Sequence, residues 1–180
     1  MFERLIIYTV FGSFFLSCES KLDDSKKYSN NLQKLNKEYS IELNTQWVKD
    51  ESFKISQYCI RQGIKTKNTK SGLRYFIINS SNSEISPSIG DEVVLSYDVR
   101  LMDPNKTKCY HSDSNGLAKF KIEGSTVESG IHEVVTYLNK GDSALVILPH
   151  FLAHGVTGDS KKIPPLSAVL YYIKLIDVLH

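Results

Sequence analysis

The chain has 180 residues, of which 41% are hydrophobic and 23% are charged. This length allows one compact domain with extensions and is too short for two large domains. The formal net charge is +2, and no basic stripe is visible, so we expect no nucleic-acid partner. Only five prolines and ten glycines are present, which excludes a low-complexity chain.

The first residues have the pattern of a targeting segment. Leu5 to Leu16 form an apolar run of twelve residues, shorter than the roughly 20 that a membrane-spanning helix needs. The run has the length of a signal-peptide core, and Arg4 precedes it. It ends at Ser17 and Cys18, and a cysteine in this place resembles the lipobox of bacterial lipoproteins.

The lipobox resemblance implies a signal peptide over residues 1–17 and acylation of Cys18, with palmitate among the attached chains. We therefore expect a lipid-anchored protein of the bacterial cell envelope that faces the periplasm. Each buried methylene contributes about 0.8 kcal/mol, so two or more acyl chains hold a protein to a bilayer persistently. The alternative is an ordinary secretory signal with an incidental cysteine. No later segment is long and apolar enough to span a membrane.

Two further cysteines, Cys59 and Cys109, leave two alternatives open. An oxidising periplasm would allow them to form a disulfide. Two free or buried thiols fit the sequence equally well, because sequence alone does not give the geometry that a disulfide needs.

Composition divides the remaining chain into three parts. Residues 18–45 are rich in polar residues without a clear hydrophobic period, which predicts a flexible tether with some helical character. Residues 46–72 are predicted to be a helical extension and linker, with a helix from Trp47 that stops at Gly63. Residues 73–180 are predicted to be the folded domain.

Strand patterns dominate this domain. Val93 to Leu101 alternates between apolar and polar residues, which predicts a half-buried strand, and Asp103 to Asn105 predicts a turn. Further strands are expected at Leu73–Asn79, Phe120–Glu123, Ala144–Leu148 and Ala168–Leu179. A long loop is expected over residues 149–167.

A single short helix is predicted between the third and fourth of these strands. Its apolar stripe repeats at the spacing of one helix face and consists of Ile131, Val134, Val135 and Leu138. Ser129 is the expected cap and Gly141 the expected end. Four or five strands around one short helix make an α+β half-barrel.

The stretch from Gly141 to Pro165 carries specific motifs. A strand that ends at Pro149 is followed by Ala153-His154-Gly155 and then by Ile163-Pro164-Pro165. This order resembles the FKBP family of peptidyl-prolyl isomerases, and residues 90–97 resemble the entry strand of that family. The resemblance covers residues 90–179 and implies a curved antiparallel sheet wrapped around one helix.

The same resemblance implies a peptidyl-prolyl cis–trans isomerase, or rotamase, that helps proline-containing polypeptides to fold. No cofactor and no metal are expected for this reaction. Together with the lipobox and the helical extension, the chain is similar to gliding-motility-associated FKBP-type lipoproteins. That similarity implies motility or secretion machinery as a partner.

The resemblance also implies which residues form the proline-binding cleft and its hydrogen-bond donors. They are Tyr97, Tyr110, His111, Phe120, Val127, Glu128, Ile131, His154, Ile163 and Tyr171. The alternative is that the aromatic members, which alternate on strands, are simply core residues.

Four of these positions depart from the family pattern. Ile131 replaces the tryptophan of the cleft floor, and Glu128 replaces an isoleucine whose backbone N–H is expected to bind substrate. The cleft aspartate of the family falls near His111, and its tyrosine donor is His154. We therefore expect weak isomerase activity. The alternatives are a binding module that holds proline segments without turnover and a structural envelope lipoprotein.

Two other kinds of site were considered. His150 and His154 are four residues apart, a spacing that suits a metal site on a helix. Here they flank a loop that begins with a proline, which makes a metal site the minor alternative. No nucleophile elbow is present, so a hydrolase has no support.

Overall fold

The computed structural model describes residues 19–179, so the predicted signal peptide and Cys18 lie outside the described residues. The elements are α1 Glu19–Gln62, β1 Lys67–Asn68, β2 Arg74–Asn79, β3 Glu92–Leu101, β4 Lys108–His111, α2 Ser112–Asn115, β5 Ala118–Lys121, α3 Ser129–Val135, β6 Ser143–Leu148, η1 His150–Leu152 and β7 Val169–Leu179. The chain forms two compact units, Met1–Gln46 and Trp47–His180.

The first unit contains the beginning of α1. We predicted a flexible tether with some helical character over residues 18–45, and the structure has helix from Glu19 onward. The sequence from residue 19 to residue 62 has no proline or glycine, so nothing in it breaks a helix. Side chains from residue 29 to residue 46 are exposed, which explains why no apolar period announces this helix.

The last turns of α1, from Trp47 onward, belong to the second unit and form the predicted helix. Ile55, Tyr58 and Cys59 are buried there and pack on β6 and β7. The helix ends at Gln62, and Gly63 follows with a φ of +64°. Its N–H donates to the Ile60 carbonyl, so the predicted glycine stop is confirmed.

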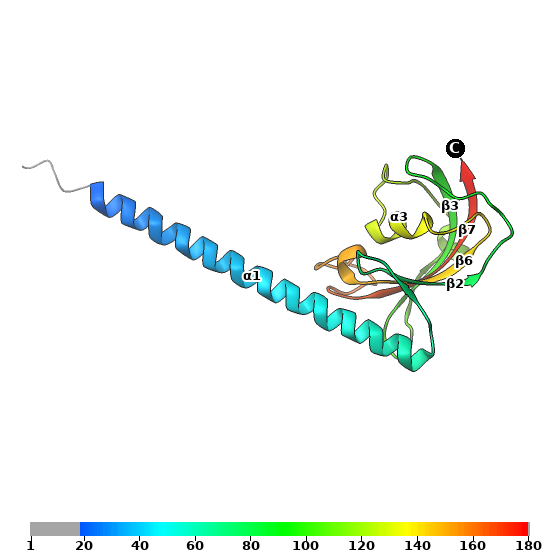
Figure 1. Cartoon of the computed structure of the whole chain (residues 1–180), viewed down its shortest axis with the longest axis horizontal. Coiled ribbons are helices and arrows are strands. Elements are labelled where there is room, and N and C mark those ends of the chain that lie inside the picture. The colour runs from blue at the N-terminus through cyan, green and yellow to red at the C-terminus, as the bar shows by residue number, and fades with distance from the viewer. Residues whose placement is uncertain (1–18, 180) are drawn as a thin grey trace, which may run out of the picture. The chain divides into compact units, whose positions relative to one another are not determined.

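The sheet has seven antiparallel strands. Six of them follow the order β1-β2-β6-β7-β3-β4, and β5 pairs with residues 92–95 of β3. All five predicted strands are present. The short elements β1, β4, α2 and η1 were not predicted from the sequence. Figure 1 shows that the sheet curves around α3, so the expected α+β architecture with one helix inside a half-barrel is confirmed.

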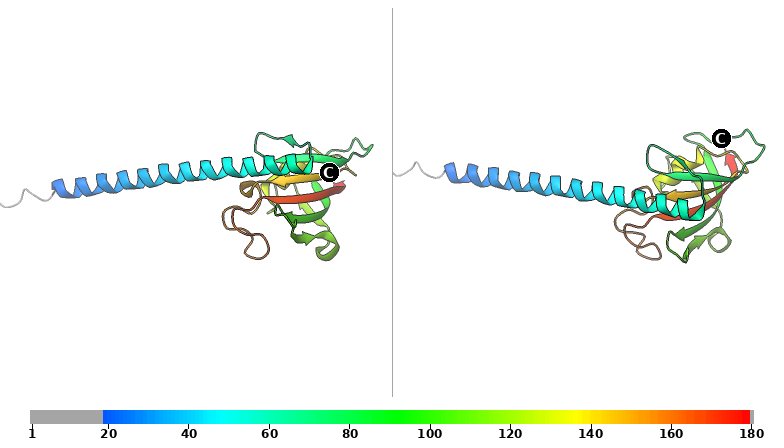
Figure 2. Two further views of the ribbon diagram at one scale, coloured as in Figure 1. Left: turned by 90° about the horizontal axis from the view of Figure 1, so that it is seen from below. Right: turned by 60° about the horizontal axis from the view of Figure 1, so that its bottom comes forward.

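The sheet separates two clusters of buried side chains. Successive residues of a strand point to opposite faces. Ala144, Val146 and Leu148 of β6 therefore face the inner cluster with α3, and Leu145 and Ile147 face the end of α1. Figure 2 shows the last turns of α1 alongside the sheet.

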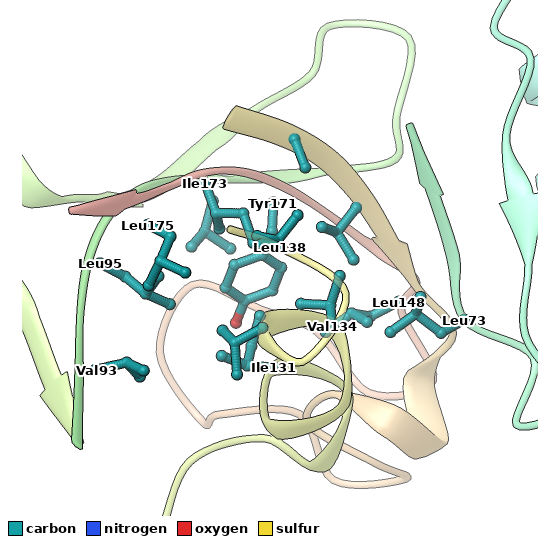
Figure 3. Packing of buried hydrophobic residues seen from close by; sticks show 14 of the residues in the cluster. Leu73, Val93, Leu95, Ile131, Val134, Leu138, Leu148, Tyr171, Ile173 and Leu175 are labelled. Carbon is teal, nitrogen blue, oxygen red and sulfur yellow. The ribbon is translucent and has the colours of Figure 1, made fainter. Parts of the chain in front are cut away.

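The inner cluster is the main core and depends on the predicted stripe of α3. Val134, Val135 and Leu138 are fully buried. Figure 3 shows Ile131, Val134 and Leu138 among side chains of the surrounding strands. The helix is shorter than predicted and ends at Val135, but Leu138 still reaches the core through a tighter turn in which its N–H donates to the Val135 carbonyl.

Both described cysteines are free and buried, and they lie in different clusters. Cys59 belongs to the outer cluster under α1, and Cys109 belongs to the inner one. The sheet lies between them, which rules out the disulfide alternative.

Within residues 19–179, no helix combines the length and the apolar composition that crossing a bilayer requires.

Candidate active site

A cavity of about 750 Å³ opens on the inner side of the sheet, beside the start of α3. Its polar lining residues are Asn115, Thr126, Glu128, His154, Asp159 and Lys161. Its apolar and aromatic lining residues are Leu95, Tyr97, Val99, Tyr110, Ala118, Phe120, Val127, Ile131, Ala153, Tyr171 and Ile173. Such an apolar hollow with a few polar groups is the usual form of a ligand site.

Strand register explains why aromatic rings meet here. Val99 of β3 pairs with Tyr110 on one side and with Tyr171 on the other. Residues directly opposite each other in neighbouring strands point to the same face of a sheet. One row across β4, β3 and β7 therefore brings two tyrosine rings into the same cavity. Phe120 enters from β5, where it pairs with Val93.

Eight of the ten predicted site residues line this cavity. They are Tyr97, Tyr110, Phe120, Val127, Glu128, Ile131, His154 and Tyr171. The other two, His111 and Ile163, do not line it.

His111 lies on the outer face of the sheet. It directly follows Tyr110 on β4 and so points to the opposite side. It pairs with Asp98 of β3, and its Nε2 lies 3.0 Å from the Ser114 hydroxyl. The placement of a cleft residue at His111 is therefore corrected. The missed β4 strand and its irregular register with β3 explain the error.

Ile163 is a core residue, with only 2% of its surface exposed. Its backbone exchanges hydrogen bonds with Asp159, whose N–H donates to the Ile163 carbonyl and whose carboxylate accepts from the Ile163 N–H. The residue thus supports the loop behind the cavity instead of forming its surface.

Ile131 is almost fully buried at 3% exposure and contributes the α3 side of the cavity. The neighbouring Gly130 allows this close approach of the helix. A Cβ at Gly130 would lie 2.4 Å from Leu148 and 3.0 Å from the Leu152 carbonyl oxygen. Any other residue at this position would push α3 away from β6 and η1.

Glu128 places a carboxylate inside the cavity. Its backbone carbonyl accepts the first hydrogen bonds of α3, so Glu128, and not Ser129 as predicted, is the N-cap residue. The side chain does not cap the helix and instead accepts a 2.9 Å hydrogen bond from the Tyr171 hydroxyl. The Tyr171 hydroxyl points toward the start of α3 in Figure 3. Burial, together with the nearby negative charge, raises the pKa of Tyr171 well above its ordinary value.

His154 approaches the same carboxylate from the loop after η1. Its Nε2 lies 3.1 Å from Glu128 Oε1, close enough for an ion pair when the imidazole is protonated. The direction of approach does not satisfy hydrogen-bond geometry, so this nitrogen has no hydrogen-bond partner among the described residues. The nitrogen itself is buried beside the Glu128 carboxylate.

Asp159 is a cavity residue that the sequence did not predict, and it makes several hydrogen bonds there. Its Oδ2 accepts a short hydrogen bond from the Tyr110 hydroxyl. Its Oδ1 accepts from the backbone N–H groups of Lys161, Lys162 and Ile163 at 2.8–2.9 Å. The only local signal is an aspartate just after a glycine at a turn, which is typical of a side chain that bonds to backbone N–H groups ahead of it.

These hydrogen bonds shift the pKa values of both Asp159 and Tyr110. Burial opposes ionisation of Asp159, but the bonds from Tyr110 and from the loop N–H groups outweigh it and hold the pKa of the carboxyl well below its usual range. The same hydrogen bond, with burial, raises the pKa of Tyr110 to about 12. One carboxylate thus joins β4 to the loop.

Gly158 makes the turn that brings Asp159 into place. Its φ is +68°, and a Cβ here would lie 2.2 Å from the Ile163 carbonyl oxygen. The loop therefore closes tightly upon itself between Gly158 and Pro164.

The two histidines of the metal alternative have separate surroundings. His150 is buried, and its Nδ1 lies 2.7 Å from Glu51 Oε2. His154 lines the cavity next to Glu128. Over residues 19–179 no group of three or more potential metal ligands is present.

Comparisons with known proteins agree with this geometry. Residues 83–176 match the family described as FKBP-type peptidyl-prolyl cis-trans isomerase. The chain is 30% identical over 120 residues to the FKBP-type 22 kDa peptidyl-prolyl cis-trans isomerase of Escherichia coli K12, a match that covers 66% of this chain and 55% of the relative. It is 31% identical over 130 residues to the probable FKBP-type peptidyl-prolyl cis-trans isomerase FkpA of Neisseria meningitidis, covering 72% and 45%.

The chain thus spans about half the length of the curated relatives that it matches. Among solved structures, FkpA from Escherichia coli has the same fold with a TM-score of 0.61 at 22% identity, covering 91% of this chain and 74% of the other. The family match extends over more than half of the sequence and includes the strands, the helix and the loop that form the cavity. The chain therefore belongs to the FKBP-type peptidyl-prolyl cis-trans isomerase family.

Proposed function

We propose that the protein is a peptidyl-prolyl cis–trans isomerase and that the cavity beside α3 binds the proline. The observation that carries the proposal is the meeting of Tyr97, Phe120, Ile131 and Tyr171 in one cavity of about 750 Å³. Proline-containing polypeptides are the substrate class, since a proline ring needs an apolar and aromatic site of this kind.

The chemistry needs no nucleophile and no metal. Rotation about a peptide bond faces a barrier of about 18–20 kcal/mol, because resonance gives the bond partial double-bond character. An apolar site that removes water from the carbonyl favours the twisted, less polar amide. Each 1.36 kcal/mol removed from the barrier increases the rate about tenfold.

We propose that two groups hold the peptide during rotation. The first is His154, which lines the cavity and whose buried Nε2 has no hydrogen-bond partner among the described residues; the ring would turn toward the peptide to donate through this nitrogen. The backbone N–H of Glu128 is the second proposed donor, because the residue lies at the cavity wall before the first turn of α3.

A second candidate function is binding without turnover. It is supported by the contact between His154 and Glu128 Oε1 at 3.1 Å. A histidine held as an ion pair is less available to the substrate, so the cavity would then retain proline segments and catalyse weakly. A structural lipoprotein without a binding role has no observation in its favour.

A protease-free isomerisation assay with proline tetrapeptides tests the proposal, together with Phe120→Ala. We expect kcat/KM to fall about tenfold or more, since a buried ring of the cavity is lost. Phe76→Ala is the control, because Phe76 is a 41% exposed residue of β2 outside the cavity. Saturable peptide binding without turnover would favour the binding module, and neither binding nor turnover would overturn both functions.

We further propose that the protein works at the bacterial cell envelope, anchored through acylated Cys18. The support is the apolar run from Leu5 to Leu16 that ends directly before Ser17-Cys18. Cys18→Ser should move the full-length protein from the membrane fraction to the soluble envelope fraction. A variant that remains in the membrane fraction would refute the anchor.

Most specifically, we propose that the protein acts on motility or secretion proteins. It is supported by the combination of the lipobox with the helical extension. A deletion strain of the organism that encodes the protein tests this role. Surface spreading is measured in the deletion strain and after complementation with wild type or Phe120→Ala. Unchanged spreading of the deletion strain would refute the motility role.

A further inference from the structure

The cavity contains more negative than positive side chains. Two carboxylates line it, Glu128 and Asp159, against the single ammonium group of Lys161, and the His154 imidazole lies beside Glu128. Lys161 is exposed and belongs to the loop at the edge, whereas 22% of the Glu128 side chain is exposed. A negative charge within an apolar lining is screened less than one at the surface.

The two carboxylates differ in what they can still bind. Both oxygens of Asp159 are occupied, one by Tyr110 and the other by three loop N–H groups. Glu128 uses Oε1 for the Tyr171 hydroxyl. Its Oε2 accepts no hydrogen bond within residues 19–179, and a carboxylate oxygen has room for two. Glu128 is therefore the carboxylate with free capacity toward a bound peptide.

Glu128 is also held in place before a ligand arrives. Its backbone begins α3, and its side chain is fixed by Tyr171, which is itself 6% exposed in the core. A fixed carboxylate loses little conformational freedom on binding, so its contact with a cation is stronger than that of a mobile surface residue. It lies three residues before Ile131, at the cavity wall beside the proposed floor for the proline ring.

We propose that Glu128 is a specificity-determining residue that selects proline segments with a lysine or arginine next to the proline. The inference rests on the proposed proline site and names its preferred substrate class. A cation beside the proline would pair with Glu128 Oε2, whereas an aliphatic neighbour would leave this oxygen desolvated without a partner. An acidic neighbour would be repelled.

Binding of fluorescent peptides Ala-X-Pro-Phe and Ala-Leu-Pro-X, with X as lysine, leucine or glutamate, tests this proposal. In at least one series we expect the lysine peptide to bind about fivefold more tightly than the leucine peptide, corresponding to about 1 kcal/mol. The glutamate peptide should bind most weakly. Raising the salt concentration should reduce the lysine preference without changing the leucine affinity as much.

Variants assign the preference to one carboxylate. Glu128→Gln keeps the shape and should make lysine and leucine peptides equal, and Glu128→Lys should reverse the order in favour of glutamate. Glu123→Gln removes a carboxylate from an exposed residue outside the cavity and should leave the preference unchanged. Melting curves confirm that each variant is folded.

Turnover of the same peptides separates this inference from the proposed function. A lysine preference in binding without turnover would overturn the isomerase and keep the role of Glu128. Turnover with equal affinities, or a lysine preference that survives Glu128→Gln, would overturn the role of Glu128 and keep the isomerase. If no proline peptide binds, both proposals fail.

Discussion

Glu51 of α1 holds His150 through two hydrogen bonds across 99 residues of sequence. Its Oε1 accepts from the His150 backbone N–H at 2.9 Å, and its Oε2 lies 2.7 Å from His150 Nδ1. The His150 carbonyl accepts from the N–H groups of Ala153 and Gly155, which flank His154. The end of α1 is thereby connected to the segment that places His154 in the cavity.

Breaking this pair should destabilise the second unit. Glu51→Ala leaves a buried backbone N–H and a buried imidazole without their partner, so we expect a loss of about 2–4 kcal/mol of unfolding free energy. Chemical denaturation measures it. Glu38→Gln is the control, since Glu38 makes only an exposed 3.9 Å pair with Lys34 and should change stability by less than about 0.5 kcal/mol. Equal stability of Glu51→Ala and wild type would show that the contact is dispensable.

The stripe of α3 should be essential for folding. Val135→Asp places an unpaired carboxylate at a fully buried position and should cost several kcal/mol, about as much as the whole stability of a small domain. Val156→Asp makes the same change at a residue that is 58% exposed and should leave the melting temperature nearly unchanged. A Val135→Asp variant that melts like wild type would show that this face of α3 is not core.

Strands and helices with one buried face could be predicted from the sequence, because the spacing of their own apolar residues shows which face is buried. The alternation in Val93–Leu101 and the stripe of α3 report which face is buried, and both are confirmed. Residues 29–46 of α1 could not be predicted as a helix, since their side chains are exposed and carry no hydrophobic period.

Tyr97 and Tyr171 were predicted as site residues from the family resemblance, and both line the cavity. Asp159 was not predicted, because its role depends on Tyr110, which lies 49 residues earlier and meets it only after β4 and the loop have packed. His111 was misplaced because it follows Tyr110 on β4, and successive residues of a strand point to opposite faces. Side-chain pairs distant in sequence carry no local signal.

The bond between Asp159 and Tyr110 should fix the loop over a defined pH range. The pKa of Asp159 is lowered on folding, so its contribution is complete above the unfolded value of about 4 and is lost as pH falls. The pKa of Tyr110 is raised to about 12, so its contribution is complete below the unfolded value of about 10 and is lost as pH rises through about 12.

Hydrogen exchange of the Lys161–Ile163 amides measures this range. Asp159→Ala should speed their exchange at pH 7, and the difference from wild type should shrink below about pH 4. Tyr110→Phe should have a smaller effect, because the three loop N–H bonds to Asp159 remain. Exchange that is unchanged in Asp159→Ala would mean that other contacts hold the loop.

Ile131 provides the sharpest test of where the proline ring lies. The side chain is 3% exposed and faces the cavity from α3, so a larger apolar group there should exclude more water and contact more of the ring. We expect Ile131→Trp to raise kcat/KM about tenfold, or about 1–2 kcal/mol of barrier. Overpacking costs about 1–3 kcal/mol of stability, so melting curves must accompany the rates.

Truncation of the Ile131 side chain should have the opposite effect on turnover and is an independent test. Ile131→Ala should lower turnover at least about tenfold, because it removes both apolar contact and the exclusion of water. Val134→Ala is the matched control on the same helix, since Val134 is fully buried but does not line the cavity. That variant should lose stability through a similar core defect and keep its turnover at temperatures well below melting. If folded Ile131→Trp and Ile131→Ala both isomerise proline peptides at the wild-type rate, the ring does not rest on α3, and the proline site lies elsewhere on the inner face of the sheet.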